Sequence, residues 1–383
     1  MKEIFSRMDK PLFFLTLLLS SIGVVMVFSA SNVASILQYK VSTYYFFEKQ
    51  LLIVALMFVI GLGFLVKFPI SKYDKLKSLL VLSIIASLAF LPVYGKITNG
   101  ANSWYRIGFF SVQPSEFAKS VVIIYMASYF GKNVDNKGKY FFLRPIIVCA
   151  IIAGLIFLEP DLGTAAIIGL TVFLMFWAIP FSKRRSDVKI FKIIGFVFIC
   201  AVILLMTMGG KILNEEQSSR LIYKDPCTRY IQKTGYQVCN GMIAMNNGGL
   251  KGVGLGNSTQ KYLYLPEAHT DFIFPIIVEE LGLISGIGII MLYVLILFRI
   301  LKIAKSAKNL TSSLMAYGTF IVILLHILIN LGGILALIPL TGVPLPLLSY
   351  GGSITINTLL LIFICLRISI ESNIKKEKKL RKA

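Results

Sequence analysis

The sequence contains a series of long apolar runs, each close to the roughly 20 residues that a helix needs to cross a bilayer. Continuous apolar runs favour helices over the alternating strands of a membrane barrel. Only 15% of the 383 residues are charged, against about 25% in soluble domains. We therefore expect an all-α, polytopic membrane protein with about ten transmembrane helices. The predicted spans are residues 11–30, 50–66, 78–93, 115–130, 145–158, 162–180, 190–209, 274–298, 313–338 and 352–368.

The basic residues are distributed unevenly between the predicted loops. The chain has 39 Lys and Arg against 18 Asp and Glu, a formal net charge of +21. Most of the basic residues lie before the first span, in every second loop, or in the basic tail at 369–383. The positive-inside rule assigns these segments to the cytoplasm. The charge thus indicates topology and not nucleic-acid binding. We expect both termini to be cytoplasmic, with a large extracellular loop at 210–273 between spans 7 and 8 of one domain, 1–383.

Cysteine, histidine and glycine patterns exclude several kinds of site. Cys227 and Cys239 both lie in the predicted outer loop, where oxidation allows a disulfide. His269 and His326 have no His or Cys neighbour at metal-ligand spacing, which argues against zinc. No serine has the setting of a Ser-His-Asp nucleophile. The GVGLG run at 252–256 lacks the preceding strand of a dinucleotide site, so its glycines are expected to allow tight turns or close backbone approach.

The segment NGANSWYRIGFFSVQPSEFAKS carries the first cluster of reactive side chains. Pro114 suits a first helical turn, and Glu116 would lie near the positive end of the helix dipole. Glu116 and Lys119 share a helix face and can pair. They fit a boundary carboxylate with a snorkelling lysine as well as they fit a functional pair. Trp104 and Arg106 suit either a membrane interface or a surface that stacks on sugar and binds phosphate.

Two breaks between apolar spans carry polar residues. In EPDLGT at 159–164, Asp161 either caps the next helix, which is the favoured interpretation, or binds a metal or a hydroxyl. In NLGGILALIPLTGVPLPLLSYGGS at 330–353, prolines and glycines break the helix at the outer surface. Irregular backbone at membrane depth is tolerated where it is buried or lines a cavity. The polar end of this segment, with Ser349, favours a ligand-facing loop.

The stretch KYLYLPEAHTDFIFPIIVEELGL at 261–283 has the highest concentration of ionisable groups in apolar surroundings. Asp271 lies where the outer loop meets a span, near the outer membrane surface. Glu279 and Glu280 follow two turns into the helix and must face protein or a water-filled cavity. We expect a structural or proton-linked role for these two glutamates.

Four segments together resemble the SEDS family (shape, elongation, division and sporulation proteins) of polytopic peptidoglycan polymerases. They are GANSWYRIG…QPSEFAK at 100–119, EPDLGTA at 159–165, LPEAHTDFIF…EELG at 265–282 and PLTGVPLPLLSYGGS at 339–353. They occur in family order, and the sequence is more similar to the division branch, FtsW, than to the elongation branch, RodA. The family often has a basic residue where this chain has Ser103.

The resemblance implies a glycosyltransferase that polymerises lipid II into glycan strands at the outer face of the bacterial cytoplasmic membrane, at the division septum. It implies an inverting single displacement that releases undecaprenyl pyrophosphate. Asp271 matches the family's catalytic aspartate, and Glu116, Lys119 and Asp161 match positions that line the same cavity. The implied partners are a class B penicillin-binding protein and other divisome proteins. A divalent cation (Mg²⁺ or Mn²⁺) is the expected cofactor, and no organic cofactor is expected.

The candidate site therefore has two groups of residues. We predict Asp271 as general base, with Lys119 and Glu116 completing the catalytic group. The predicted substrate-binding residues are Trp104, Arg106, Asp161, Lys261, Glu267, His269 and Ser349. Three alternatives stay open at this point: a lipid II flippase, an elongation-type polymerase, and a non-catalytic scaffold for a transpeptidase.

Overall fold

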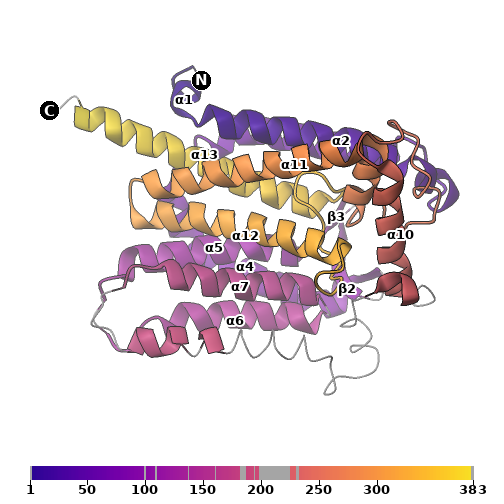
Figure 1. Cartoon of the computed structure of the whole chain (residues 1–383). Helices are drawn as coiled ribbons and strands as arrows, with labels where there is room; N and C mark the ends of the chain where they lie inside the picture. The colour runs from indigo at the N-terminus through magenta and orange to yellow at the C-terminus, as the bar shows by residue number, and fades with distance from the viewer. Residues whose placement is uncertain are drawn as a thin grey trace.

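A bundle of long helices with a cap across one end makes up the computed structural model (Figure 1). It describes residues 2–98, 101–107, 110–136, 138–159, 161–181, 187–193, 195–197, 225–229 and 233–380. The elements are α1 (Lys2–Arg7), α2 (Lys10–Leu37), α3 (Tyr45–Ile60), η1 (Gly61–Leu65), α4 (Ile70–Tyr94), β1 (Lys96–Thr98), β2 (Ala101–Ile107), β3 (Phe110–Val112), α5 (Pro114–Asn133), α6 (Leu143–Leu158), α7 (Leu162–Ala178), η2 (Pro226–Arg229), α10 (Lys233–Gly248), α11 (Ile273–Ser306), α12 (Leu310–Ile334) and α13 (Gly352–Leu380).

Several helices have the length and composition of membrane spans. Within the described residues there are six, at Lys10–Leu37, Tyr45–Leu65, Ile70–Val93, Ile273–Ser306, Leu310–Ile334 and Gly352–Lys375. Two shorter apolar helices, α6 and α7, lie beside them. The prediction of a helical membrane protein is confirmed. The count of ten spans stays a prediction, because the span predicted at 190–209 lies largely outside the described residues.

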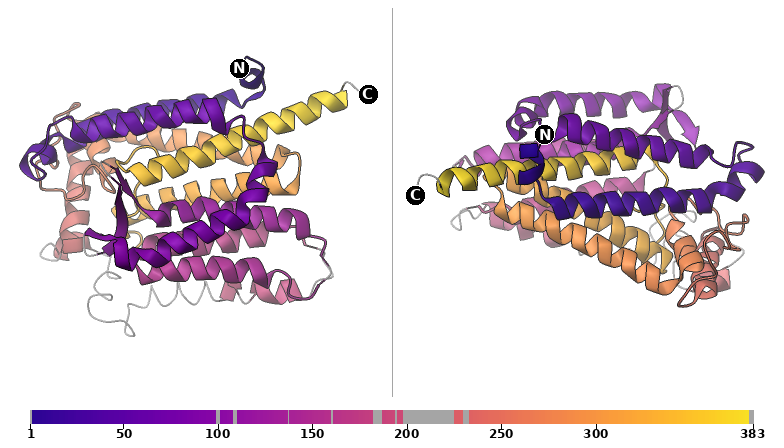
Figure 2. Two further views of the ribbon diagram at one scale, coloured as in Figure 1. Left: turned by 180° about the vertical axis from the view of Figure 1, so that it is seen from behind. Right: turned by 90° about the horizontal axis from the view of Figure 1, so that it is seen from above.

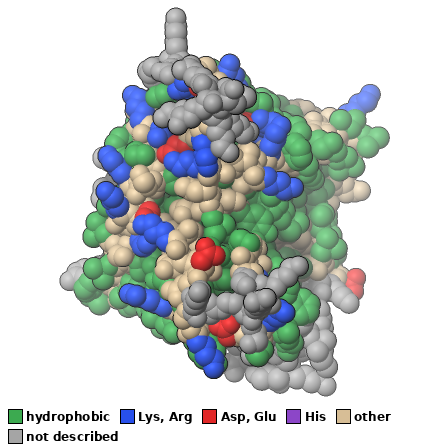
Figure 3. Space-filling model, turned by 90° about the vertical axis from the view of Figure 1, so that its left-hand side faces the viewer, with side chains coloured by type: hydrophobic (Ala, Val, Ile, Leu, Met, Phe, Trp, Pro, Cys, Tyr) green, Lys and Arg blue, Asp and Glu red, His purple; other side chains and the backbone are tan. Residues whose placement is uncertain are grey.

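Both chain ends lie at the same end of the bundle (Figures 1 and 2). The Arg7 guanidinium pairs with Glu377 at 2.7 Å, and the Asn373 amide donates to the Arg7 carbonyl at 2.7 Å. Lys and Arg side chains are spread over the left-hand end of the Figure 1 view (Figure 3). This distribution agrees with a cytoplasmic placement of that end. α13 continues to Leu380, so most of the predicted basic tail is helical.

The all-α prediction is wrong for the segment before α5. It forms a small antiparallel sheet in the order β1-β2-β3, in which Trp104 faces Lys96 and Tyr105 faces Val112. Aromatic and β-branched residues favour strands, but the segment is too short to register in a search for membrane-length runs. The Tyr105 hydroxyl donates to the Ser87 carbonyl of α4 at 2.7 Å and thereby attaches the sheet to the bundle.

The glycine-rich loop after α10 fills a break in α11. Gly282 has φ 83° and ψ 167°, which interrupts the helix and frees its hydrogen-bonding groups. Residues 249–254 satisfy them; for example, the Val253 N–H donates to the Glu279 carbonyl at 2.9 Å. A Cβ atom on Gly252 or Gly282 would lie 2.3 Å from backbone oxygen on the other segment. The glycines thus allow close approach of the chain to itself.

A disulfide links Cys227 in η2 to Cys239 in α10, a pairing that the cysteine positions allowed but did not decide. α10 lies across the end of the bundle that is opposite the chain termini (Figure 1) and packs against α11. A disulfide at this end agrees with an oxidising, extracellular location for the loop.

Candidate functional site

The four segments singled out in the sequence meet at the end of the bundle that α10 covers. The Asp161 carboxylate before α7 accepts a hydrogen bond from the Gln113 amide before α5, at 3.1 Å. The Gln113 N–H in turn donates to the Ser353 hydroxyl at the start of α13, at 2.9 Å. The Tyr350 N–H donates to the His269 carbonyl at 2.9 Å. Direct contacts therefore connect segments that are far apart in the sequence.

Asp271 lies just before α11 and is 9% exposed. Its Oδ1 atom accepts from the Thr270 hydroxyl at 3.1 Å, and its carbonyl accepts from the Asn330 amide of α12 at 2.7 Å. Its Oδ2 atom lies 3.5 Å from where a Cβ on Gly342 would stand. Asp271 is thus held between the outer loop, α12 and the proline-rich segment at 339–353.

A second carboxylate stands close to Asp271. The Thr270 hydroxyl also contacts Oε2 of Glu267, at 2.7 Å. Burial, and then the negative charge of Glu267, raise the pKa of Asp271 to about 7, against the opposing effect of the Thr270 hydrogen bond. A carboxyl group with a pKa near neutrality can both take up and release a proton, which suits a general base.

If Asp271 is the predicted general base, the lipid II polymerisation expected from the sequence should rise with pH through about 7, because only the deprotonated carboxylate can accept a proton. Glu267→Gln removes a neighbouring negative charge that raises the pKa of Asp271. The midpoint of the pH–rate profile should therefore move to lower pH in this variant. Initial rates measured across pH 5–9 for both proteins test this, and an unmoved midpoint would contradict the coupling of Glu267 to Asp271.

Glu116, Lys119 and His326 form a buried polar cluster between α5 and α12. The Lys119 ammonium lies 2.7 Å from Oε1 of Glu116, the predicted i,i+3 pair, and 2.9 Å from Nε2 of His326. Their exposed fractions are 4%, 1% and 2%. His326 was considered in the sequence only as a metal ligand and was missed as a member of this cluster. The sequence feature that could have indicated its role is the spacing of two polar residues, His326 and Asn330, four apart in an apolar helix.

Asp161 is the N-cap of α7. Its Oδ1 atom accepts from the Thr164 N–H at 3.0 Å, and Oδ2 accepts from Gln113 and from the Ser115 hydroxyl. The capping interpretation is therefore confirmed, and the same carboxylate joins α7 to α5. Glu159, two residues earlier, is buried with both carboxylate oxygens unpartnered among the described residues. Burial, and then the charge of Asp161, raise the pKa of Glu159 to about 8.

Trp104 and Arg106 both lie on β2. Trp104 is half-buried and Arg106 is exposed. Arg106 stands opposite Ser111 of β3, and the Ser103 hydroxyl donates to the Glu159 carbonyl at 3.2 Å. The sheet thus carries both residues beside the turn between α6 and α7.

Lys261, Glu279 and Glu280 anchor the outer loop to α11. The Lys261 ammonium pairs with Glu280 at 3.0 Å, and the Ser29 hydroxyl of α2 donates to the same carboxylate at 2.6 Å. Glu279 accepts from the Thr259 hydroxyl at 2.8 Å. The glutamates have buried partners, as expected, and most of these come from the loop itself. Lys261 was predicted to bind substrate; in the structure its ammonium pairs with Glu280.

His269 and Ser349 are also held inside the protein. The His269 ring packs against Phe46 and Tyr350, with centroids 4.6 and 5.7 Å away. Burial lowers the pKa of His269 against the opposing charge of Glu267, which favours the neutral imidazole. The Ser349 hydroxyl is fully buried and accepts from the Leu345 N–H at 2.9 Å. Ser349 therefore stabilises the proline-rich turn rather than facing an open site.

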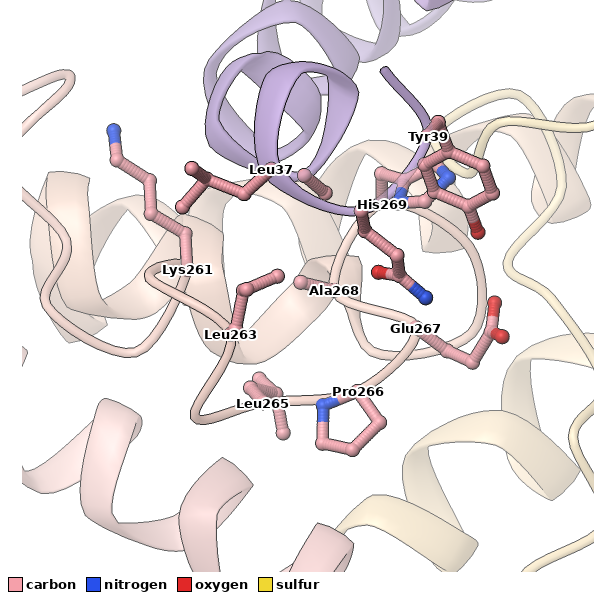
Figure 4. A pocket seen from close by; sticks show the side chains of 11 residues that line it. Leu37, Tyr39, Lys261, Leu263, Leu265, Pro266, Glu267, Ala268 and His269 are labelled. Carbon is pink, nitrogen blue, oxygen red and sulfur yellow. The ribbon is translucent and has the colours of Figure 1, made fainter.

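A pocket of about 420 Å³ lies between the end of α2 and the outer loop (Figure 4). Glu267 and Tyr39 lie on one side of it, and Lys261 and Leu263 lie on the other. Asp271 does not line this pocket. Glu267 lines it and is connected to Asp271 through the Thr270 hydroxyl. The lining residues are Ala34, Leu37, Gln38, Tyr39, Lys261, Leu263, Leu265, Pro266, Glu267, Ala268 and His269.

Among the described acidic and histidine side chains, none form a metal cage. Among the residues that the structure describes, no three His, Cys, Asp or Glu side chains come together as metal ligands. Apart from Glu159, the carboxylates described above contact hydroxyl, amide, ammonium or backbone groups. The expected divalent cation stays a prediction.

Residues 10–374 match the family model for FtsW, RodA and SpoVE, described as a cell cycle protein. The probable peptidoglycan glycosyltransferase FtsW of Bacillus subtilis (strain 168) is 36% identical over 361 residues, covering 92% of this chain and 88% of that protein. A chain of a peptidoglycan synthase complex has a TM-score of 0.75 at 23% identity, covering 95% and 98%. Rod shape determining protein RodA of Thermus thermophilus has a TM-score of 0.68 at 24% identity, covering 94% and 96%. The two structural likenesses establish the fold.

Proposed function

The chain belongs to the family of cell cycle proteins that includes FtsW, RodA and SpoVE, and we propose that it is a peptidoglycan glycosyltransferase that polymerises lipid II. It is a multi-pass membrane protein. The observation that carries the proposal is the buried Asp271, whose pKa is raised to about 7 at the end of the bundle where the four family segments meet. A buried carboxyl group of this kind suits proton transfer from a sugar hydroxyl.

In the proposed reaction, Asp271 takes the proton of the acceptor sugar hydroxyl as that oxygen attacks the anomeric carbon of the donor. A new C–O bond forms, and the bond from the anomeric carbon to the pyrophosphate oxygen breaks. The lipid pyrophosphate leaves with the bonding electron pair. Because the donor is already activated by this leaving group, no covalent enzyme intermediate is needed, and one displacement inverts the configuration.

The Lys119 ammonium on α5 is the proposed positive charge for the leaving group. Lys119 would stabilise the departing pyrophosphate, and Glu116 holds the ammonium in place at 2.7 Å. Arg106, exposed on β2, would bind phosphate from the outer side. A divalent cation stays part of the proposal as a companion of the pyrophosphate, since such ions often bind through substrate phosphates. No step is assigned to it.

A role in cell division, at the septum, is supported by the similarity to relatives named FtsW. The similarity to a chain of a synthase complex that coordinates polymerization and crosslinking supports a partner of the class B penicillin-binding type. Other divisome proteins complete the proposed set of partners.

The proposal is tested with the purified chain in detergent and fluorescent lipid II, with and without its cognate transpeptidase. Long glycan strands are the expected product. A flippase would make none, because it forms no glycosidic bond, and detergent provides no second leaflet to which it could move the substrate. Failure to form glycan with the transpeptidase present would reject the polymerase function.

A further inference from the structure

His326 contacts two parts of the candidate site from near the middle of α12. Its Nε2 atom lies 2.9 Å from the Lys119 ammonium, and its Nδ1 atom lies 3.3 Å from the Pro344 carbonyl oxygen. His326 is 2% exposed, so its ring lies away from bulk solvent. Both nitrogens must therefore be matched by these protein groups.

The two contacts fix the protonation pattern of the ring. The Pro344 carbonyl can only accept, so Nδ1 carries the hydrogen and donates to it. Nε2 then has a lone pair and accepts from the Lys119 ammonium. The ammonium has three donors; Glu116 and His326 engage two of them. The third N–H and Oε2 of Glu116 have no partner among the described residues.

α12 connects this cluster to the aspartate. Asn330 follows His326 by four residues, about 6 Å along the same helix face. Its amide donates to the Asp271 carbonyl at 2.7 Å and to the Val343 carbonyl at 2.8 Å. One rigid helix thus contacts the Lys119 side through His326 and the Asp271 side through Asn330.

We propose that His326 is a positioning residue: it accepts a hydrogen bond from Lys119, orients the free N–H of that ammonium, and ties it to the proline-rich segment beside Asp271. The inference rests on the proposed function, in which Lys119 binds the departing pyrophosphate. His326 itself touches no substrate in this role. Its effect is to hold the cation at a fixed distance from the base, since small displacements of a catalytic group are costly.

His326→Gln and His326→Asn separate the two contacts. The longer glutamine can bring an acceptor oxygen to Lys119, whereas the shorter asparagine reaches only the Pro344 carbonyl. Losing a hydrogen bond to a charged group should lower the saturated polymerisation rate of H326N by about 10- to 100-fold. H326Q should stay close to the parent. Leu328→Ala, on the exposed side of α12, is the matched control.

A second readout does not depend on polymerisation. Affinity for a polyprenyl pyrophosphate, measured by thermal shift in detergent, should be weaker for H326N than for H326Q. If the parent forms no glycan but this difference is seen, the proposed function fails and the positioning role stands. Equal rates and affinities for the two variants would overturn the positioning role.

If H326N proves unstable, the histidine is tested in a chain that already carries Lys119→Met. Without the ammonium, adding His326→Asn should not weaken pyrophosphate binding further, because the residue acts through Lys119. A further loss in the double variant would show that His326 acts independently, and the proposal would be overturned.

Discussion

Asp271→Asn is expected to lower the rate of lipid II polymerisation by about 100- to 10,000-fold, the usual contribution of a positioned general base. The amide has nearly the same shape as the carboxylate but no basic oxygen. Its carbonyl can still accept from the Thr270 hydroxyl, and the backbone contact with Asn330 is unaffected. Because a neutral amide is cheaper to bury than a carboxylate, the variant should fold. Initial rates of glycan formation from fluorescent lipid II measure the effect.

Asp74→Asn is the matched control for the loss of a carboxylate. Asp74 pairs with Lys77 at 3.0 Å in the first turns of α4 and with Lys132 near the end of α5, and it takes no part in the candidate site. Its substitution should leave the polymerisation rate within about threefold of the parent, as expected for a small change in a partly exposed pair. Parental activity in Asp271→Asn, with a parental melting temperature, would show that another group removes the proton.

The membrane helices could be predicted because the rules that govern them are local. A lipid environment requires long apolar runs with internally paired backbone, and this requirement is visible in each segment separately. The Glu116–Lys119 pair and the Asp161 cap were predictable for the same reason, since their partners lie three residues away. The small sheet was missed because its strands are short.

The remaining features depend on contacts between distant residues. His326 and Lys119 are separated by 207 residues, and the Ser29 hydroxyl reaches Glu280 across 251 residues. Apolar periodicity gives no information on which helix faces meet, so these partners could not be assigned. Lys261 was predicted as a substrate-binding residue; its burial against Glu280 became visible only in three dimensions.

The second large effect is expected on stability, at the Lys261–Glu280 pair. Both side chains are almost fully buried, and the ammonium lies 3.0 Å from the carboxylate. Lys261→Met leaves Glu280 charged with only hydroxyl and backbone donors, such as Ser29 and the Ser258 N–H. Breaking a buried pair by removing one partner costs about 3–5 kcal/mol. We therefore expect the melting temperature to fall and the outer loop to exchange amide hydrogens faster.

A double-mutant cycle identifies the cause of this loss. Lys261→Met combined with Glu280→Gln removes both charges. The double variant should therefore lose less stability than the sum of the losses in the two single variants. Lys77→Met provides the control, because its partly exposed pair with Asp74 should contribute less than about 1 kcal/mol. If Lys261→Met were no more destabilising than Lys77→Met, the pair would not anchor the loop. The fixed position of Asp271 would then have to come from Asn330 and the proline-rich segment alone.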